Sequence, residues 1–206
     1  SSGYGSVIIT KAISIVGTGT IAGVLASSGG NAITVNAGAN DAVFVDALAV
    51  QGAGLGSNGI VFNSGASLTV SRCTIRGFGD SSSGTGILIV PTSGSPTITV
   101  TDTIVSGNAS TGIAYYASGG AAMAKLLVTR VLVEKNRLGI NLNANQSSGS
   151  LNAQISDVTA SHNSSIGIYV SGTTATTAML DNVRAFNNDR GISSNEGGAI
   201  SITLLR

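Results

Sequence analysis

A glycine–isoleucine pair returns along this chain at nearly constant intervals, and this repeat limits the fold more than any other feature. The successive intervals are 27, 26, 27, 28 and 24 residues. The pairs are Gly59-Ile60, Gly86-Ile87, Gly112-Ile113, Gly139-Ile140, Gly167-Ile168 and Gly191-Ile192. Ala32-Ile33 lies another 27 residues upstream and extends the series by one. A period of this length indicates a repeat architecture, in which each unit packs against its neighbours.

Two alternating patterns fill each repeat. The residue two positions after the paired isoleucine is usually apolar: Val35, Phe62, Ile89, Tyr115, Leu142 and Val170, with Ser194 as the exception. Between the pairs runs a second pattern, apolar-x-apolar-x-x-apolar-x-apolar, over residues 43–50, 68–75, 98–105, 126–133, 153–160 and 178–185. Thr103 is the one position of its 24 that is not apolar. Alternation with one extra residue in the middle predicts two short strands joined by a bend, and it does not fit a 3.6-residue helical period.

Three short strands per repeat of about 27 residues predict an all-β fold. We expect a single-stranded parallel β-helix, or solenoid, of about seven coils, because a β-sandwich would show hairpin signals every 8–12 residues. Residues 1–206 are expected to form a single β-helix domain. No amphipathic capping helix is found at either end, and residues 200–205 start the second pattern without completing it. We therefore expect a fragment, or a domain uncapped at both ends.

Composition narrows the function classes. Only 9% of the residues are charged and the formal net charge is +1, which argues against a nucleic-acid partner. No apolar stretch reaches the length of a membrane span. The single cysteine, Cys73, excludes an intramolecular disulfide, and its place in the second pattern predicts a buried side chain. A charge-poor surface rich in Ser, Thr, Gly and Asn favours an extracellular or cell-surface location, as in secreted bacterial repeat proteins.

An asparagine follows the second pattern in four successive repeats: Asn108, Asn136, Asn163 and Asn188. We predict that these residues form a structural ladder at one corner of the solenoid. Asparagine tolerates the left-handed conformation of a tight turn, and stacked amides can form hydrogen bonds from coil to coil. A role in substrate binding is the alternative interpretation.

A second column lies at the outward residue in the middle of the second pattern: Arg72, Asp102, Arg130, Asp157 and Asn182. Its charges alternate in sign, so we expect modest exposed ion pairs that help to fix the register of the coils. Each aspartate would have an arginine above and below it, which keeps the carboxylate ionised. A catalytic carboxylate pair would need two acids close together.

At the level of its coil pattern, nearly the whole chain resembles the right-handed parallel β-helix superfamily typified by pectate lyases and polygalacturonases. The stretch VNAGANDAVFVDALAVQGAGLGSNGIVF, residues 35–62, is similar to uncharacterised bacterial β-helix-repeat proteins. The resemblance implies a right-handed solenoid and polysaccharide as the ligand class, although fold does not imply function.

The enzymes of that superfamily use motifs that this chain lacks. Pectate lyases hold calcium with clustered Asp or Glu and abstract a proton with Arg or Lys, whereas polygalacturonases use Asn-Thr-Asp, Asp-Asp and His-Gly segments. The seven aspartates here are dispersed, and the only histidine, His162, precedes Asn163. A Ser-His-Asp triad stays open, but no nucleophile-elbow motif supports it. We therefore predict no catalytic residue, no metal site and no cofactor, and we lean towards a protein that is not an enzyme.

Charged residues beside the asparagine column are the remaining candidates for a binding site. This His162 group spans three coils and consists of Glu134, Lys135, Arg137, His162, Arg184, Asp189 and Arg190. A cationic ridge with one histidine could bind an acidic sugar or support general acid–base chemistry. The alternative is a solvated corner that keeps the protein soluble. A threonine-rich ice-binding face is not favoured, because Thr97-x-Thr99 is not repeated in register.

These observations lead to three function classes. The first is a secreted or cell-surface non-enzymatic β-helix scaffold, adhesin-like or assembling end to end into filaments. The second is a polysaccharide-binding module, and the third, less favoured, is a polysaccharide lyase or hydrolase. The expected partners are further copies of the chain or a polysaccharide, with no nucleic acid and no membrane span.

Overall fold

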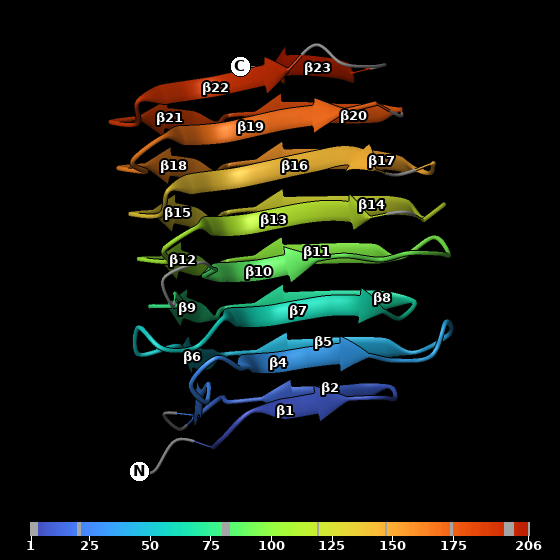
Figure 1. Cartoon of the computed structure of the whole chain (residues 1–206), viewed down its shortest axis with the longest axis vertical. Helices are drawn as coiled ribbons and strands as arrows, with labels where there is room; N and C mark the ends of the chain where they lie inside the picture. The colour runs from blue at the N-terminus through green and yellow to red at the C-terminus, as the bar shows by residue number, and fades with distance from the viewer. Residues whose placement is uncertain are drawn as a thin grey trace.

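A computed structural model describes residues 4–19, 22–79, 83–118, 120–146, 148–173, 175–195 and 200–205. The chain winds into an elongated stack of coils, with β1 and β22 at opposite ends (Figure 1). Every strand pairing among the described residues is parallel, and these ranges contain strands and turns but no helix. None of them therefore forms a helix that is long and apolar enough to cross a membrane.

Each of the first seven coils contributes one strand to each of three parallel sheets, and β22 and β23 add one more strand to the first and second sheets. The first sheet consists of β1 (Val7–Ile9), β4 (Asn31–Asn36), β7 (Asn58–Ser64), β10 (Thr85–Ile89), β13 (Thr111–Ser118), β16 (Leu138–Gln146), β19 (Ile166–Gly172) and β22 (Arg190–Asn195). The second sheet consists of β2 (Ile13–Val16), β5 (Ala42–Asp46), β8 (Ser67–Ser71), β11 (Thr97–Thr101), β14 (Met123–Thr129), β17 (Ser150–Ser156), β20 (Thr176–Asp181) and β23 (Ile200–Leu205). The third sheet consists of β3 (Ala22–Leu25), β6 (Leu48–Gln51), β9 (Thr74–Arg76), β12 (Ile104–Ser106), β15 (Leu132–Glu134), β18 (Thr159–Ser161) and β21 (Arg184–Phe186).

The register confirms the predicted parallel β-helix of about seven coils of roughly 27 residues. The paired isoleucines stack directly on one another through the first sheet, from Ile33 to Ile192. All of them are fully buried except Ile192 in the last coil. A single coil cannot cover its own apolar edge, so this column is stable only because each coil is packed between two others.

The second pattern fills the rest of the core. Its inward residues are buried in every repeat, apart from the partly exposed Val183 and Ala185. Thr103 is also buried, and its hydroxyl donates to the Thr101 carbonyl at 2.8 Å and accepts the Cys73 N–H at 3.2 Å. A polar residue fits this apolar column because both of its hydrogen-bonding capacities are used locally. Cys73 is a core residue, and burial raises the pKa of its thiol.

Residues with a positive φ, in the left-handed backbone conformation, form the bends between the sheets. The bend between the second and third sheets holds one such residue per coil: Ala47, Arg72, Asp102, Arg130, Asp157 and Asn182. At the corner between the third and first sheets, we expected the ladder asparagines to be left-handed, and this expectation is wrong. The positive φ belongs to the residue before each asparagine: Gly107, Lys135, His162 and Asn187. The left-handed residue turns the chain, so the asparagine that follows can direct its amide into the corner.

Candidate functional site

The corner between the third and first sheets holds a continuous ladder of asparagine amides. Asn108, Asn136 and Asn163 are buried, and Asn188 is partly exposed. Each Nδ2 donates to the Oδ1 of the next asparagine, at 3.0 Å from Asn108, 3.2 Å from Asn136 and 3.0 Å from Asn163. The backbone N–H of the same three residues donates to the same oxygens at 3.0, 3.1 and 2.9 Å. Each amide therefore ties its own coil to the coil that follows.

The amides also bond to the coil that precedes them. Nδ2 of Asn136 reaches the Val105 carbonyl at 3.4 Å, and Nδ2 of Asn163 reaches the Val133 carbonyl at 3.3 Å. Phe78 occupies the ladder position one coil before Asn108, and its N–H donates to Asn108 Oδ1 at 3.1 Å. A buried aromatic ring thus takes the place of the amide where the ladder begins.

The close approach of successive coils explains the glycine of the repeated pair, for which the sequence offered no reason. A Cβ on Gly112 would lie 3.0 Å from Asn136 Nδ2, 2.7 Å from the Gly139 carbonyl oxygen and 2.4 Å from Val133 Cγ1. Gly59, Gly86, Gly139 and Gly167 are likewise crowded by the carbonyl oxygen of the paired glycine in the next coil, at 2.3, 2.7, 2.4 and 2.6 Å. Only a residue without a side chain fits against this carbonyl, and the asparagine amides add further contacts in the ladder repeats. The signal that sequence reasoning missed is that the paired glycines recur at one position of the coil, where successive coils approach closely.

The bend between the second and third sheets carries the column of alternating charge. Arg130 Nε and Nη2 donate to the two carboxylate oxygens of Asp102, at 2.7 and 2.9 Å. These bonds lower the pKa of Asp102 to about 2, with smaller contributions from Thr101 and from the charges of Arg130 and Arg72. The expectation that each aspartate has an arginine on both sides is wrong for Asp157, because Asn182 occupies the next position and its Nδ2 donates to Asp157 Oδ1 at 2.6 Å.

The sequence did not identify the partner of Arg72. Its guanidinium forms two hydrogen bonds with Asp46, one of them from Nε to Oδ1 at 2.9 Å. Asp46 is buried and lies one residue before the column, in which Ala47 takes its place. The bonds from Arg72 hold the pKa of Asp46 below its usual value. Sequence reasoning considered the column positions alone, so it overlooked a carboxylate that points to the same corner from the neighbouring position.

The structure brings together only parts of the His162 group. Lys135 and His162 are exposed and stack at equivalent left-handed positions of successive coils. Lys135 Nζ lies 3.7 Å from Glu134 Oε1. His162 Nε2 lies 3.1 Å from Asn187 Nδ2, and its ring meets Phe186 edge to face at 6.0 Å.

The remaining members of the His162 group lie within a few residues of Lys135 or of Asn187 in the sequence, but they do not bond to Lys135 or His162. These members are Arg137, Arg184, Asp189 and Arg190. Within the described ranges, no side-chain hydrogen bond or ion pair links any of them to Lys135 or His162. All four are exposed. Also within those ranges, no group of three or more His, Cys, Asp or Glu residues is placed to hold a metal ion.

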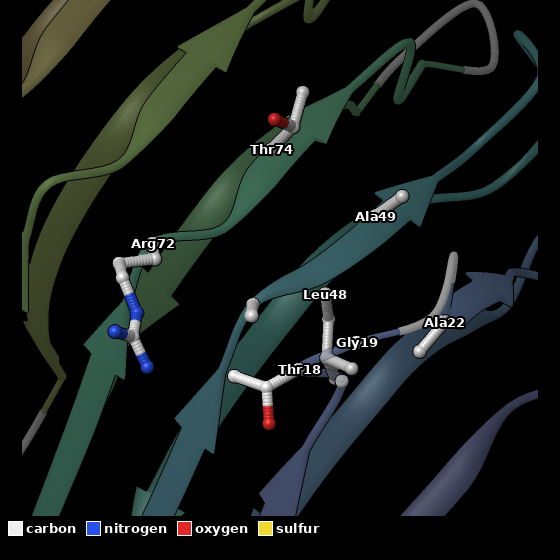
Figure 2. Close-up of a pocket in the computed structure, with 9 residues that line it drawn as sticks. Thr18, Gly19, Ala22, Leu48, Ala49, Arg72 and Thr74 are labelled. Carbon is white, nitrogen blue, oxygen red and sulfur yellow. The ribbon is translucent and has the colours of Figure 1, made fainter.

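The surface of the described residues includes the following hollows. One of about 490 Å³ lies over the bend between the second and third sheets in the first coils, where Arg72, Thr18 and Thr74 line it (Figure 2). Arg72 is the one charged residue of this lining, and its guanidinium is already engaged by Asp46. A second hollow, of about 270 Å³, lies between the turn that holds Pro91 and Pro96 and the turn around Gly65 in the preceding coil. A third, of about 380 Å³, opens beside the first coil and is mostly apolar. No pattern in the sequence predicted these hollows.

The comparisons with known proteins agree with this architecture. The family described as the right handed beta helix region has a model that matches residues 2–149, well over half of the chain. Neither the curated proteins nor the solved structures give a match. The coil register, the three parallel sheets and this match lead to one conclusion. The chain belongs to the right-handed β-helix family.

Proposed function

We propose that this β-helix is a non-enzymatic extracellular or cell-surface scaffold that stacks end to end with further copies of itself. The observation that carries the proposal is the exposure of core columns in the terminal coils of the described chain. Leu204 is 64% exposed, whereas Leu180, its neighbour in the same column, is 1% exposed. At the other end, Ile13 is 41% exposed, whereas Val43, which stacks on it in the same column, is 2% exposed. Apolar surface of this kind is stabilised by a further coil.

The backbone at these ends supports the same proposal. β1, β2 and β3 are the last strands of their sheets at one end, and β21, β22 and β23 are the last strands at the other. Along the outer side of these strands lie N–H and C=O groups that can pair with another strand. Tyr4 already occupies part of this side on β3, where its N–H donates to the Gly23 carbonyl at 3.0 Å and its carbonyl accepts the Leu25 N–H at 2.9 Å. Because all pairings are parallel, the first coil of one copy would complement the last coil of another. Such a head-to-tail contact does not close on itself and generates filaments.

The mostly apolar hollow beside the first coil adds a site for this contact. It is lined by Tyr4, Val7, Ile15 and Val16, among others. At the opposite end, Leu204 and Leu205 present exposed aliphatic side chains of matching character. Burial of these groups between two copies would contribute free energy in proportion to the apolar area removed from water.

Assembly is tested by electron microscopy and sedimentation velocity over a range of protein concentrations. We expect filaments for the wild type and smaller species for Leu204→Asp, because a charge would be buried in the contact. Leu127→Asp is the matched control, since Leu127 is an exposed leucine on the outer face of the second sheet, three coils before β23. Dispersed wild-type monomers at every concentration would contradict the proposal.

A second candidate function is the binding of an acidic polysaccharide by the His162 group. It is favoured by the exposed stacking of Lys135 and His162 along one corner. We expect Lys135→Ala combined with His162→Ala to weaken retention by polygalacturonate. Unchanged retention and unchanged cleavage in a reducing-sugar assay would remove this candidate.

A further inference from the structure

The two ends of the described solenoid are not flat, because the three sheets stop at different levels. At the C-terminal end, β22 and β23 extend the first and second sheets beyond β21, so the third sheet is one strand short. At the N-terminal end the third sheet extends furthest, since Tyr4 forms a parallel bridge with Val24 of β3. The step at one end therefore lies in the sheet that is short at the other.

Tyr4 is also the first member of an inward column of the third sheet. The column continues through Val24 and ends at Ala185 in β21. Its intermediate members are fully buried: Val50, Ile75, Val105, Val133 and Ala160. Tyr4 is 77% exposed, because no described coil lies beyond it, and Ala185 is partly exposed. A large ring at one end and a small side chain at the other end suit each other in a packed junction.

One outward column of the second sheet changes its character at its two ends. Its internal members are polar: Asp46, Ser71, Thr101, Thr129, Ser156 and Asp181. The column begins with Val16, which is 50% exposed, and ends with Leu205, which is 47% exposed. Polar residues thus occupy the positions that face water, and apolar residues occupy the two positions that would meet if a second copy continued the stack.

We propose that copies of the chain stack in one fixed register, in which every column of one copy continues into the same column of the next. This register rests on the end-to-end stacking proposed above and specifies its contacts. Tyr4 takes the next position on β21, β1 lies on β22, and β2 lies on β23. The pairs across the junction are Tyr4 with Ala185, Val7 with Ile192, Ile15 with Leu204 and Val16 with Leu205.

The step at each end selects this register over others. Turning one copy about the solenoid axis by one sheet would place the Tyr4 segment against β22 or β23, which already extend one strand further than β21. Sliding β2 along β23 by one residue would set inward side chains against outward ones, because side chains alternate along a strand. Only the continuous register buries Tyr4, Ile15 and Leu204 together.

Cysteine pairs on the outer face of the second sheet test the register. Ser14 in β2 and Thr203 in β23 are exposed and lie at the two ends of one outward column. In the proposed register their Cα atoms would be about 5 Å apart across the junction, which a disulfide can span. β2 and β23 are the first and last of eight strands in their sheet. Within one chain the two residues are therefore roughly 34 Å apart, so the bond can form only between copies.

Ser14→Cys with Thr203→Cys should give a ladder of covalent oligomers on non-reducing gels after treatment with oxidised glutathione. Ser14→Cys with Ser201→Cys is the matched control, because Ser201 is exposed on the same face of β23 but two residues away. Its Cα would be about 8 Å from that of Ser14, which is too far for a disulfide. We expect about tenfold less crosslinking from this pair. The wild type controls for Cys73, which is buried.

A second test addresses the contact between Val16 and Leu205. Val16→Lys with Leu205→Glu places opposite charges across the proposed junction, and Val16→Lys with Leu205→Lys places like charges there. In sedimentation velocity, the like-charged variant should need about fivefold more protein to assemble, and added salt should reduce this difference. Circular dichroism shows whether both variants fold. Equal assembly of the two folded variants at low salt would overturn the register.

The outcomes distinguish the register from end-to-end stacking itself. Filaments that are crosslinked by the Ser14 and Thr203 pair, and not by the control pair, support both. Filaments that are crosslinked by the control pair, by both pairs equally or by neither pair would overturn the register and leave the stacking in place. Dispersed monomers in electron micrographs, without crosslinks from either pair, would overturn both.

Discussion

Two corners of the solenoid solve the same problem with opposite chemistry. At both, a left-handed residue turns the chain, and one side chain per coil reaches its counterpart in the next coil. The asparagine ladder is buried and uncharged, and backbone groups complete its hydrogen bonds. The pair of Arg130 and Asp102 is ionic and open to solvent, with 58% and 39% of the two side chains exposed. The shorter, charged bonds lie where water competes with them.

The comparison shows that the burial of a hydrogen bond affects its contribution to stability more than its length or charge does. In an exposed ion pair, the two charged groups give up contacts with water to contact each other, so the net contribution to stability is small. A buried amide has no such alternative, and losing its partner leaves donors and acceptors unsatisfied. Ions inside the corner would cost more to desolvate than they could recover. Asp46 lies between the two cases, because it is buried while its partner Arg72 is mostly exposed.

The sharpest way to break this comparison is the same substitution at both corners. In Asn136→Asp, a carboxylate oxygen replaces Nδ2 and faces two acceptors, Asn163 Oδ1 and the Val105 carbonyl. We expect a loss of roughly 3–5 kcal/mol in the free energy of unfolding at neutral pH, because a buried charge is left without compensation. The loss should shrink on acidification, since a protonated carboxyl can donate again. Urea denaturation at several pH values measures both effects.

Asn182→Asp is the matched control, because it faces Asp157 with a second carboxylate in the exposed column. Two like charges in water should cost about 1 kcal/mol or less, and added salt should reduce the cost. Equal losses for the two variants would show that burial does not separate the corners.

A second comparison concerns two glycines five residues apart. Gly112→Ala places a Cβ against the Gly139 carbonyl and Val133, and overpacking of this kind should cost roughly 2–3 kcal/mol. Gly107 is left-handed with open space around its Cβ position, so Gly107→Ala should cost only about 1 kcal/mol from backbone strain. Thermal melting of both variants checks the order. A Gly112→Ala variant as stable as the wild type would show that the stacked coils have room for a side chain in the glycine column.

The smallest expected effect is the pH dependence of the ionic corner. The pKa of Asp102 is lowered to about 2 and that of Asp46 is lowered as well, so each carboxylate binds its proton less readily in the folded chain. Their contribution to stability is therefore complete above the ordinary pKa near 3.8 and is lost as the pH falls towards 2. Arg130→Met should remove the part of this acid limb that Asp102 contributes, and it should lower stability by the same modest amount at pH 7, where the exposed pair is intact. An unchanged acid limb would show that other carboxylates cause it.

The fold could be predicted from the sequence because its inward residues repeat. The isoleucine of the glycine–isoleucine pair and the eight-residue pattern both map onto buried columns, and even the exception, Thr103, lies inside. The asparagine column was visible for the same reason. The left-handed residues were placed one position too late, because propensity alone cannot tell which residue of a turn adopts the strained conformation.

Features that do not repeat were out of reach. Asp46 is a single carboxylate outside its column, and its bond to Arg72 depends on side chains from two coils meeting at one bend. The hydrogen bond from Asn141 Nδ2 to the Tyr116 hydroxyl likewise joins side chains from two coils that only stacking places side by side.

The sequence by itself therefore determined the coil length, the strands and the residues that face inward, because a stacked solenoid requires the same apolar choice in every repeat. The tertiary structure alone decided which outward side chains meet, since those positions vary freely from coil to coil. It also supplied the reason for the paired glycine, which is the close approach of the glycine carbonyl in the next coil. The inward pattern is a property of each repeat, whereas contacts between coils belong to the stack.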